Sequence, residues 1–330
     1  LYCLHTTYNA NQLLELAFIL YWLVYVILWV ILDCNVDLWW KERFGLPIAS
    51  LRGQVVWITG ASSGIGRALA LTLAKNGVHL VLSARRESQL QEVCDQCLKE
   101  SNGLLSSKDI LVLPMDMLDI EKHQTCFEQV LEHFGCLEIL VNNAGRSQRA
   151  NWEDINVQVD RDLFELDVFS IMHLSRIVVR YFNEEKCGHG HLAVTSSVAG
   201  MTPVAFSATY CAAKHAISAY LRALQLEHPS IDVTIFSPGP VATDFLEEAF
   251  TADPQKKVGT SSKLNKNRMA VERCGHLFGV TLANKILLSW CGVFPVVMLA
   301  YVTQYQCLRK IFYKVLGRQY LVKVREGNDK

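Results

Sequence analysis

Short β-rich runs alternate with amphipathic helical patterns along most of the chain, and this alternation restricts the possible folds more than any other feature. Six such runs lie at 54–59, 78–83, 110–113, 137–141, 191–196 and 231–236. Amphipathic stretches lie between them, among others at 65–75, 121–134, 157–182 and 209–227. Strands that are apolar on both faces and alternate with helices predict an α/β fold with a doubly wound parallel sheet. A seventh strand at 285–289 would complete the sheet.

An apolar segment precedes this pattern. Residues 16–32 carry no charge, and the apolar character extends back past Glu15 to Leu13. About twenty helical residues span roughly 30 Å, the thickness of the hydrocarbon core of a bilayer. A cleaved signal peptide would have a shorter apolar core, a basic start and small residues after it, and these are missing from the sequence. We expect a retained single-pass transmembrane helix in an internal membrane, the endoplasmic reticulum; the alternatives are a signal sequence and a hydrophobic hairpin.

We therefore divide the chain into an anchor with its linker (1–45), an α/β domain (46–290) and a C-terminal extension (291–330). Residues 286–303 are mostly apolar, and basic residues follow at 309, 310, 314, 318, 323 and 325. One interpretation is a last strand followed by a packed helix. The other is a second membrane contact whose basic flank meets lipid phosphates. The sequence does not separate the two.

The composition bears on the remaining partners. The formal net charge is zero, which gives no reason to expect a nucleic acid partner. The eleven cysteines are scattered and odd in number, which favours a reducing compartment over a disulfide scaffold. We predict no metal site.

A glycine-rich turn follows the first predicted strand and runs into a helix. Residues 59–66 read TGASSGIG. Glycines in such a turn allow a pyrophosphate to approach the backbone, and the helix N-terminus favours its negative charge. The pattern predicts a dinucleotide-binding turn formed by Gly60, Ser62, Ser63, Gly64, Ile65 and Gly66.

The end of the second predicted strand indicates which dinucleotide binds. An acidic residue there would bind the ribose 2′-hydroxyl, whereas an arginine accommodates a 2′-phosphate. Here Ala84 is followed by Arg85 and Arg86. We therefore predict that the cofactor is NADP(H), with Arg85 as its main determinant and Arg86 as a second contact. The alternative is that both arginines are solvated charges at the start of a helix.

Tyr210 and Lys214 are four residues apart, so on a helix both side chains project from one face. The ammonium of Lys214 would then favour the ionised form of the Tyr210 phenol. A tyrosine that releases its proton near neutral pH can act as an acid or a base. Taken alone, this spacing more often means a pair on a helix surface.

These motifs together resemble those of the short-chain dehydrogenase/reductase family. The resemblance covers residues 50–290 and rests on the TGxxxGxG turn, on Asn142-Asn143-Ala144-Gly145 after the fourth strand, and on the Tyr210 and Lys214 pair. Residues 82–86 and the membrane span look most like the membrane-anchored dehydrogenase/reductase member seven branch. The resemblance implies a Rossmann-type fold and an NADP(H)-dependent enzyme that interconverts a carbonyl and an alcohol.

The resemblance also implies further cofactor contacts. Asp116 and Met117 would flank the adenine, Asn142 and Ala144 would border the cofactor pocket, and Lys214 would hold the nicotinamide ribose. A turn after the sixth strand would close over the nicotinamide carboxamide with Pro238, Gly239, Val241 and Thr243. Against the NADP(H) prediction, Ser63 stands where many NADP-dependent relatives carry a basic residue.

The resemblance assigns the catalytic roles as well. Tyr210 would donate the proton in reduction, Lys214 would lower its pKa, and Ser197 would orient the carbonyl, with Ser196 as the less favoured alternative. Asp167 stands where the family has an asparagine that helps to hold a water connecting the lysine to solvent. Either the relay tolerates the aspartate, or the acid is protonated, or turnover is impaired. We expect tolerance.

The chemical class of the substrate is predicted from the loop 244–268. In folds of this kind, this loop covers the substrate. Phe245, Leu246 and Phe250 near its start favour a lipophilic substrate such as a steroid or retinoid, although they could simply pack a short helix. Membrane lipid is the expected second partner, and the helices 157–182 and 209–227 would form a homodimer. An alternative function is that of a catalytically weak NADP-binding protein of the membrane that serves in interaction.

Overall fold

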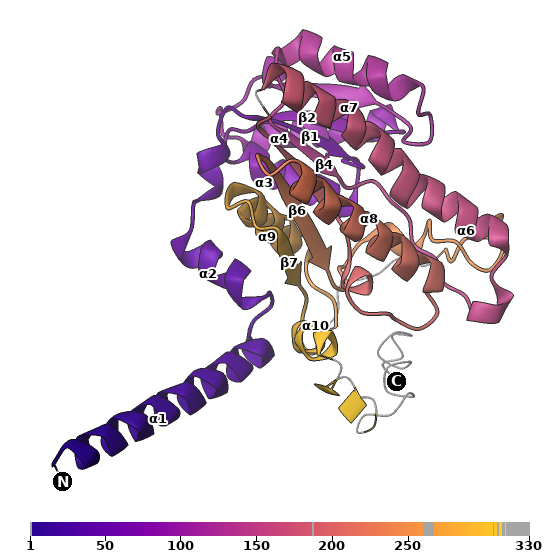
Figure 1. The fold of residues 1–330 in the computed structure, drawn as a ribbon. Helices are drawn as coiled ribbons and strands as arrows, with labels where there is room; N and C mark the ends of the chain where they lie inside the picture. Colours follow the sequence, from indigo (N-terminus) through magenta and orange to yellow (C-terminus); the bar gives the residue numbers. More distant parts are fainter. Residues whose placement is uncertain are drawn as a thin grey trace.

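Seven parallel strands form one sheet in the order β3-β2-β1-β4-β5-β6-β7 (Figure 1). The structure is a computed structural model that describes residues 2–186, 188–259, 267–305, 307, 308, 310, 311 and 314, with side chains from residue 12 onward. The strands are β1 (Val55–Thr59), β2 (His79–Ala84), β3 (Ile110–Pro114), β4 (Ile139–Asn142), β5 (Gly190–Thr195), β6 (Ile231–Pro238) and β7 (Leu288–Cys291). The predicted doubly wound parallel sheet is confirmed.

Helices cover both faces of the sheet. Alternate side chains of a strand point to opposite faces, so Val56 and Ile58 of β1 enter one apolar cluster while Val55 and Trp57 enter the other. The first cluster includes α3 (Gly64–Ala74), α4 (Glu87–Glu100) and α9 (Val271–Ala283). The second includes α5 (Lys122–Phe134), α7 (Ser170–Glu185) and α8 (Ala208–Glu227). Short 3-10 turns lie at Ile48–Leu51, Ser107–Asp109, Trp152–Asp154, Val198–Gly200 and Asp244–Leu246.

The helix predicted at 157–182 is interrupted. It consists of α6 (Val157–Phe164), a π-turn at Glu165–Phe169 and α7. A π-turn inserts one extra residue into the helix and rotates the side chains that follow, and such turns occur often at functional sites. Asp167 lies within this turn and is buried. The amphipathic pattern missed the interruption because both parts of the helix bury the same kind of apolar stripe.

The N-terminal segment begins with the long helix α1 (Tyr2–Ile31), which projects away from the α/β domain (Figure 1). Its stretch Gln12–Ile31 has a mean hydropathy of 2.3 and is long and apolar enough to cross a bilayer. By these criteria it could be either an anchor or a signal sequence. The shorter helix α2 (Val36–Phe44) follows.

The C-terminal part contains β7 and then α10 (Val296–Gln304), which packs through Val297, Ala300 and Tyr301. The described residues of this part thus form a last strand and a packed helix, and the second membrane contact stays a prediction. The strand begins at Leu288 instead of residue 285, because the turn after α9 includes Lys285 with a positive φ of 51°. Most of the basic flank, and residues 260–266 of the substrate loop, lie outside the described residues. The predicted domain limits stay a prediction.

The close approach of α3 and α9 depends on Gly275. A Cβ at this position would lie 2.6 Å from the backbone carbon of Ala68. We expect Gly275→Ala to push the helices apart and to lower the free energy of unfolding by about 1–3 kcal/mol, as overpacking does. Gly279→Ala, one turn later, is the matched control because its Cβ would meet the end of the Ile48 side chain, which can move. Thermal unfolding in detergent measures the midpoint temperature of each variant. Equal midpoints for Gly275→Ala and Gly279→Ala would contradict the prediction.

Candidate active site

A cavity of about 1050 Å³ opens at the carboxyl edge of the sheet, where β1 and β4 lie side by side although β2 and β3 come between them in sequence. Ligands of open α/β sheets bind at such a switch point. Most of the predicted site residues line the cavity: Gly60, Ser62, Ser63, Gly64, Ile65, Arg85, Arg86, Asp116, Met117, Ala144, Ser197, Tyr210, Lys214, Pro238, Gly239, Val241 and Thr243. Gly66, Asn142 and Asp167 do not. The structure thus brings together motifs that are far apart in sequence, while their roles stay predictions.

The glycine turn lies between β1 and α3 with little space for side chains. Gly60 has a φ of 66°, and a Cβ there would lie 2.9 Å from Cα of Ala144. A Cβ on Gly66 would lie 2.4 Å from the Gly60 carbonyl oxygen. Gly66 therefore shapes the turn from behind instead of lining the cavity. Among the described residues no side chain caps the first turn of α3, so its N–H groups suit an anionic ligand.

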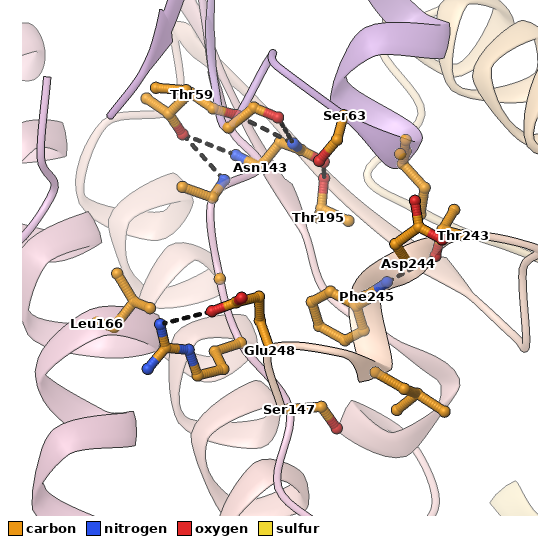
Figure 2. A pocket seen from close by; sticks show the side chains of 18 of the residues that line it. Thr59, Ser63, Asn143, Ser147, Leu166, Thr195, Thr243, Asp244, Phe245 and Glu248 are labelled. Atoms are coloured by element: carbon orange, nitrogen blue, oxygen red, sulfur yellow. Dashed lines mark hydrogen bonds and ion pairs between the residues drawn. The ribbon is translucent and has the colours of Figure 1, made fainter. Parts of the chain in front are cut away.

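A hydrogen-bond network joins the ends of β1, β4 and β5 across the cavity floor. The Thr59 hydroxyl accepts from the backbone N–H groups of Asn143 and Ala144, at 3.0 and 3.1 Å. The Asn143 amide donates to the Thr59 carbonyl at 3.0 Å and accepts from the Thr195 hydroxyl at 2.9 Å (Figure 2). Sequence reasoning missed the roles of Asn143 and Thr195. The second asparagine of the Asn-Asn-Ala-Gly motif was the signal that could have found Asn143.

Asn142 does not border the cavity, and this prediction was wrong. Its buried side chain donates from Nδ2 to the Ser175 hydroxyl at 3.1 Å, and so it lies toward α7. Asn143, the first residue after β4, lines the cavity instead.

Lys214, which lines the cavity, forms a buried ion pair with Asp167 behind it. The Lys214 ammonium lies 3.0 Å from Oδ2 of Asp167 and donates to the Thr195 carbonyl at 3.1 Å. The other carboxylate oxygen accepts from the backbone N–H of Arg146 at 2.8 Å. A Cβ on Gly145 would lie 3.1 Å from this carboxylate and 3.3 Å from the ammonium. The glycine therefore lets the loop cover the pair closely.

Burial and pairing act in opposite directions on Lys214. Burial lowers the pKa of the ammonium, but the nearby Asp167 carboxylate outweighs it, and the pKa of Lys214 lies above its usual value. For Asp167, burial is the largest influence and raises the pKa of the carboxyl against the opposing effect of Lys214. The pair therefore contributes stability between the two folded pKa values: it is lost as pH rises through the raised pKa of Lys214, and also as pH falls through the raised pKa of Asp167, because the buried ammonium then has no carboxylate partner.

Tyr210 and Ser197 reach the cavity from α8 and from the loop after β5. The Lys214 ammonium lies 5.7 Å from the centroid of the Tyr210 ring. The Ser197 hydroxyl accepts from the Ala199 N–H at 3.1 Å. Ser196 also lines the cavity, but its hydroxyl lies 2.9 Å from the Ser218 hydroxyl of α8. This contact favours Ser197 as the hydroxyl that faces a ligand.

Arg85 and Arg146 place positive charge on the cavity wall, and Nη2 of Arg146 lies 3.7 Å from Oε2 of Glu248 in the substrate loop (Figure 2). Arg85 lies exposed at the end of β2, and Arg146 follows Gly145. Burial lowers the pKa of Arg146, and repulsion from Arg85 lowers it further. Arg146 was not among the predicted residues, since an arginine after a glycine carries no distinctive spacing.

The substrate loop is joined to the segment that follows Arg146. The backbone N–H of Phe250 donates to the Ser147 carbonyl, and the backbone N–H of Arg149 donates to the Phe250 carbonyl. Arg146 places its guanidinium carbon 4.6 Å from the Phe250 ring centroid. Phe250 is buried against the cluster that includes Tyr210, and Phe245 is more exposed; both side chains line the cavity (Figure 2). The lipophilic substrate stays a prediction.

Comparison with known proteins decides the family. A family model described as short chain dehydrogenase matches residues 54–254. The chain belongs to the short-chain dehydrogenase family. It is also 38% identical to Dehydrogenase/reductase SDR family member 7 of Mus musculus over 297 residues, which cover 89% of this chain and 86% of that relative. The protein is thus an NAD(P)-dependent oxidoreductase that interconverts carbonyl and alcohol groups.

Solved structures of short-chain dehydrogenases share the fold. The alcohol dehydrogenase from the archaeon Thermococcus sibiricus, complexed with 5-hydroxy-NADP, superposes with a TM-score of 0.60 at 24% identity, covering 69% of this chain and 90% of its own. A short-chain dehydrogenase from Burkholderia phymatum in complex with NAD gives a TM-score of 0.64 at 21% identity, covering 77% and 93%.

The Lys214 and Asp167 pair should stabilise this short-chain dehydrogenase strongly. Removing one partner of a buried ion pair leaves an uncompensated charge, which destabilises by about 3–5 kcal/mol. We expect this loss for Asp167→Ala and a smaller one for Asp167→Asn, whose amide oxygen can still accept from the Arg146 N–H. Glu165→Ala, in the same π-turn but exposed, is the control. Denaturant unfolding compares the three, and equal stability of Asp167→Ala and Glu165→Ala would disprove the structural role of the pair.

Proposed function

We propose that this protein uses NADP(H) to interconvert a carbonyl and an alcohol on a lipophilic substrate of the steroid or retinoid kind, with Tyr210 as the acid/base. One observation carries the proposal: Tyr210, Lys214 and Ser197 line the same cavity as the glycine turn and Arg85. The acid/base group, the carbonyl-orienting hydroxyl and the nucleotide contacts can therefore act on one bound pair of molecules.

NADP(H) suits the residues at the end of β2. Ala84, Arg85 and Arg86 all line the cavity there, and both arginines are exposed, so a 2′-phosphate would meet positive charge without a competing carboxylate at that position. The glycine turn and the N-terminus of α3 would hold the pyrophosphate. Among the structural neighbours one is complexed with a form of NADP and another with NAD, so the choice of NADP(H) rests on this chain's own arginines.

Tyr210 would handle the proton of the reaction. Bound NADPH would supply a hydride to the carbonyl carbon. The phenol of Tyr210 donates its proton to the carbonyl oxygen, and the Ser197 hydroxyl donates a hydrogen bond that orients the same oxygen. The positive charge of Lys214 stabilises the phenolate that remains, and the Asp167 carboxylate keeps Lys214 protonated.

A lipophilic substrate fits the apolar side chains near the catalytic residues. Phe245 lies with its ring centroid 6.2 Å from that of Tyr210, and Leu246 also lines the cavity. We propose further that α1 is a retained anchor in the endoplasmic reticulum membrane, where such substrates dissolve. We also propose a homodimer through the helices predicted at 157–182 and 209–227, and a measurement of the oligomeric state in detergent tests it.

The cofactor choice is tested at Arg85. We expect Arg85→Asp to raise the KM for NADPH about 10- to 100-fold, which corresponds to the loss of about 1.5–3 kcal/mol from hydrogen bonds to a charged group. The KM for NADH should stay the same or fall, because the carboxylate can accept from the ribose hydroxyl. Arg222→Asp, exposed on α8, is the control for a simple change of charge. An unchanged KM for NADPH in Arg85→Asp would refute the assignment.

The reaction itself is tested with the purified full chain, NADPH and a panel of steroid and retinoid carbonyls. We expect NADPH oxidation with at least one member of the panel and the matching alcohol as product, measured by absorbance and chromatography. Tight NADPH binding without oxidation across a wide panel would instead support a nucleotide-binding protein without this activity.

A further inference from the structure

The chain leaving α1 joins the edge of the sheet without a free linker. Helix α1 ends at Ile31, and residues 33–35 then run antiparallel beside the end of β7, with Cys34 opposite Cys291. The Gly292 N–H donates to the Asp33 carbonyl at 2.8 Å. The Asn35 N–H donates to the Trp290 carbonyl, and the Trp290 N–H donates to the Asn35 side chain, each at 3.0 Å. The anchor helix is therefore fixed in direction relative to the sheet.

A charged cluster holds the same segment from the other side. Arg273 of α9 donates to both carboxylate oxygens of Asp33, at 2.7 and 3.0 Å. Its Nη2 also donates to Glu42 of α2 at 2.9 Å, and His276 lies 3.1 Å from the same carboxylate. Bidentate arginine contacts restrict geometry as well as adding energy. Both ends of the segment between α1 and α2 are thus bound to the α/β domain.

Helix α10 lies beside the last turns of the apolar span. The ring of Tyr301 stacks on Trp29, with centroids 4.6 Å apart and planes 7° apart, and lies 6.0 Å from Tyr25. The Tyr301 hydroxyl accepts from the Val36 N–H at 2.8 Å. Tyr25 is six residues before the end of the span at Ile31, which corresponds to about 9 Å along a helix. Helix α10 is therefore level with part of the span itself.

The side chains of α10 suit the interfacial layer of a bilayer. Residues 296–304 carry no charge, and Phe294 just before them is 55% exposed. Beyond the helix, Leu308 and Ile311 are exposed as well. Trp29, Trp290 and Tyr301 are buried between α1 and α10 and join the two helices, which leaves Phe294, Leu308 and Ile311 as the exposed apolar side chains beside the span.

Helix α10 also contacts two walls of the catalytic cavity. A Cβ on Gly239 would lie 2.7 Å from Cγ1 of Val296, and the Gly239 N–H donates to the Cys291 carbonyl at 2.7 Å. Val198, next to Ser197, packs against the cluster formed by α10 and α1. Gly239 and Val198 both line the cavity. The surface that lies level with the membrane span is therefore continuous with the catalytic edge of the sheet (Figure 1).

We propose that α10 and Phe294 lie in the interfacial layer of the same bilayer that α1 spans, so that the carboxyl edge of the sheet faces the lipid. The occupant of this apolar surface is membrane lipid, because the surface continues directly from the anchor helix. A lipophilic substrate would then reach the cavity from the membrane along α10. This inference rests on the proposed membrane anchor but adds a fixed orientation of the catalytic domain to it.

Depth measurements in phosphatidylcholine vesicles test the orientation. An environment-sensitive fluorophore is attached to the full-length chain at Phe294→Cys, in a background in which Cys3, Cys136, Cys187 and Cys307 are replaced by serine, so that the introduced thiol is the one labelled. Leu226→Cys is the matched control, since Leu226 is 86% exposed and lies at the end of α8, near the opposite edge of the sheet where β6 begins. The background chain without an introduced cysteine serves as the blank.

We expect spin-labelled lipids to quench the fluorophore at position 294 at least twofold and to leave the one at 226 unchanged, while aqueous iodide gives the opposite result. Quenching of both positions by iodide alone would overturn the proposal. Protection of position 294 from lipid and iodide together would assign the surface to a protein partner, such as a second copy of this chain, and would overturn it as well.

A third position separates this inference from the proposed anchor. Leu16 lies within the apolar span and is 63% exposed, so a fluorophore at Leu16→Cys should be quenched by lipid whenever α1 is inserted. Lipid quenching at 16 but not at 294 would overturn only the orientation. The absence of lipid quenching at 16 would overturn both the anchor and the orientation.

Discussion

The buried ion pair between Lys214 and Asp167 is the interaction on which the catalytic site depends. It joins four parts of the chain at one point: α8 supplies the lysine, the π-turn supplies the aspartate, β5 supplies the Thr195 carbonyl, and the loop after β4 supplies the Arg146 N–H. A buried charge without these partners would be strongly unfavourable. The pair therefore fixes the position of α8, and with it the position of the Tyr210 phenol.

Other features of the site follow from the same constraint. A glycine at position 145 leaves room for the pair, because a Cβ there would lie 3.1 Å from the carboxylate and 3.3 Å from the ammonium and would press on both groups. Asp167 lies buried within the π-turn, and its carboxylate contacts the Lys214 ammonium directly. The network from Thr59 through Asn143 to Thr195 then holds the three strand ends that form the cavity floor.

The sequence predicted the first six strands to within two residues, because each is apolar on both faces and is bounded by turns. Predictions from the sequence were wrong or incomplete where a feature depends on a contact with a residue far away in the chain. The interruption at Glu165–Phe169 does not change the apolar stripe, and only a distant lysine requires it. Asn143 was overlooked in favour of Asn142 because the spacing of a motif does not show which side chain faces a ligand. The antiparallel β-bridge between Cys34 and Cys291 joins residues that are far apart in the chain, and no local pattern predicts it.

The proposed function requires Tyr210 to transfer a proton, and Tyr210→Phe tests this most directly. The substitution removes one oxygen, while Tyr220→Phe on the same helix is the matched control. NADPH binding followed by fluorescence should be retained in both proteins. The single-turnover rate at which a carbonyl substrate from the panel oxidises bound NADPH should fall by about 10²–10⁴-fold in Tyr210→Phe alone, as expected for the loss of a general acid. A rate in Tyr210→Phe equal to that of the unsubstituted protein would contradict the account.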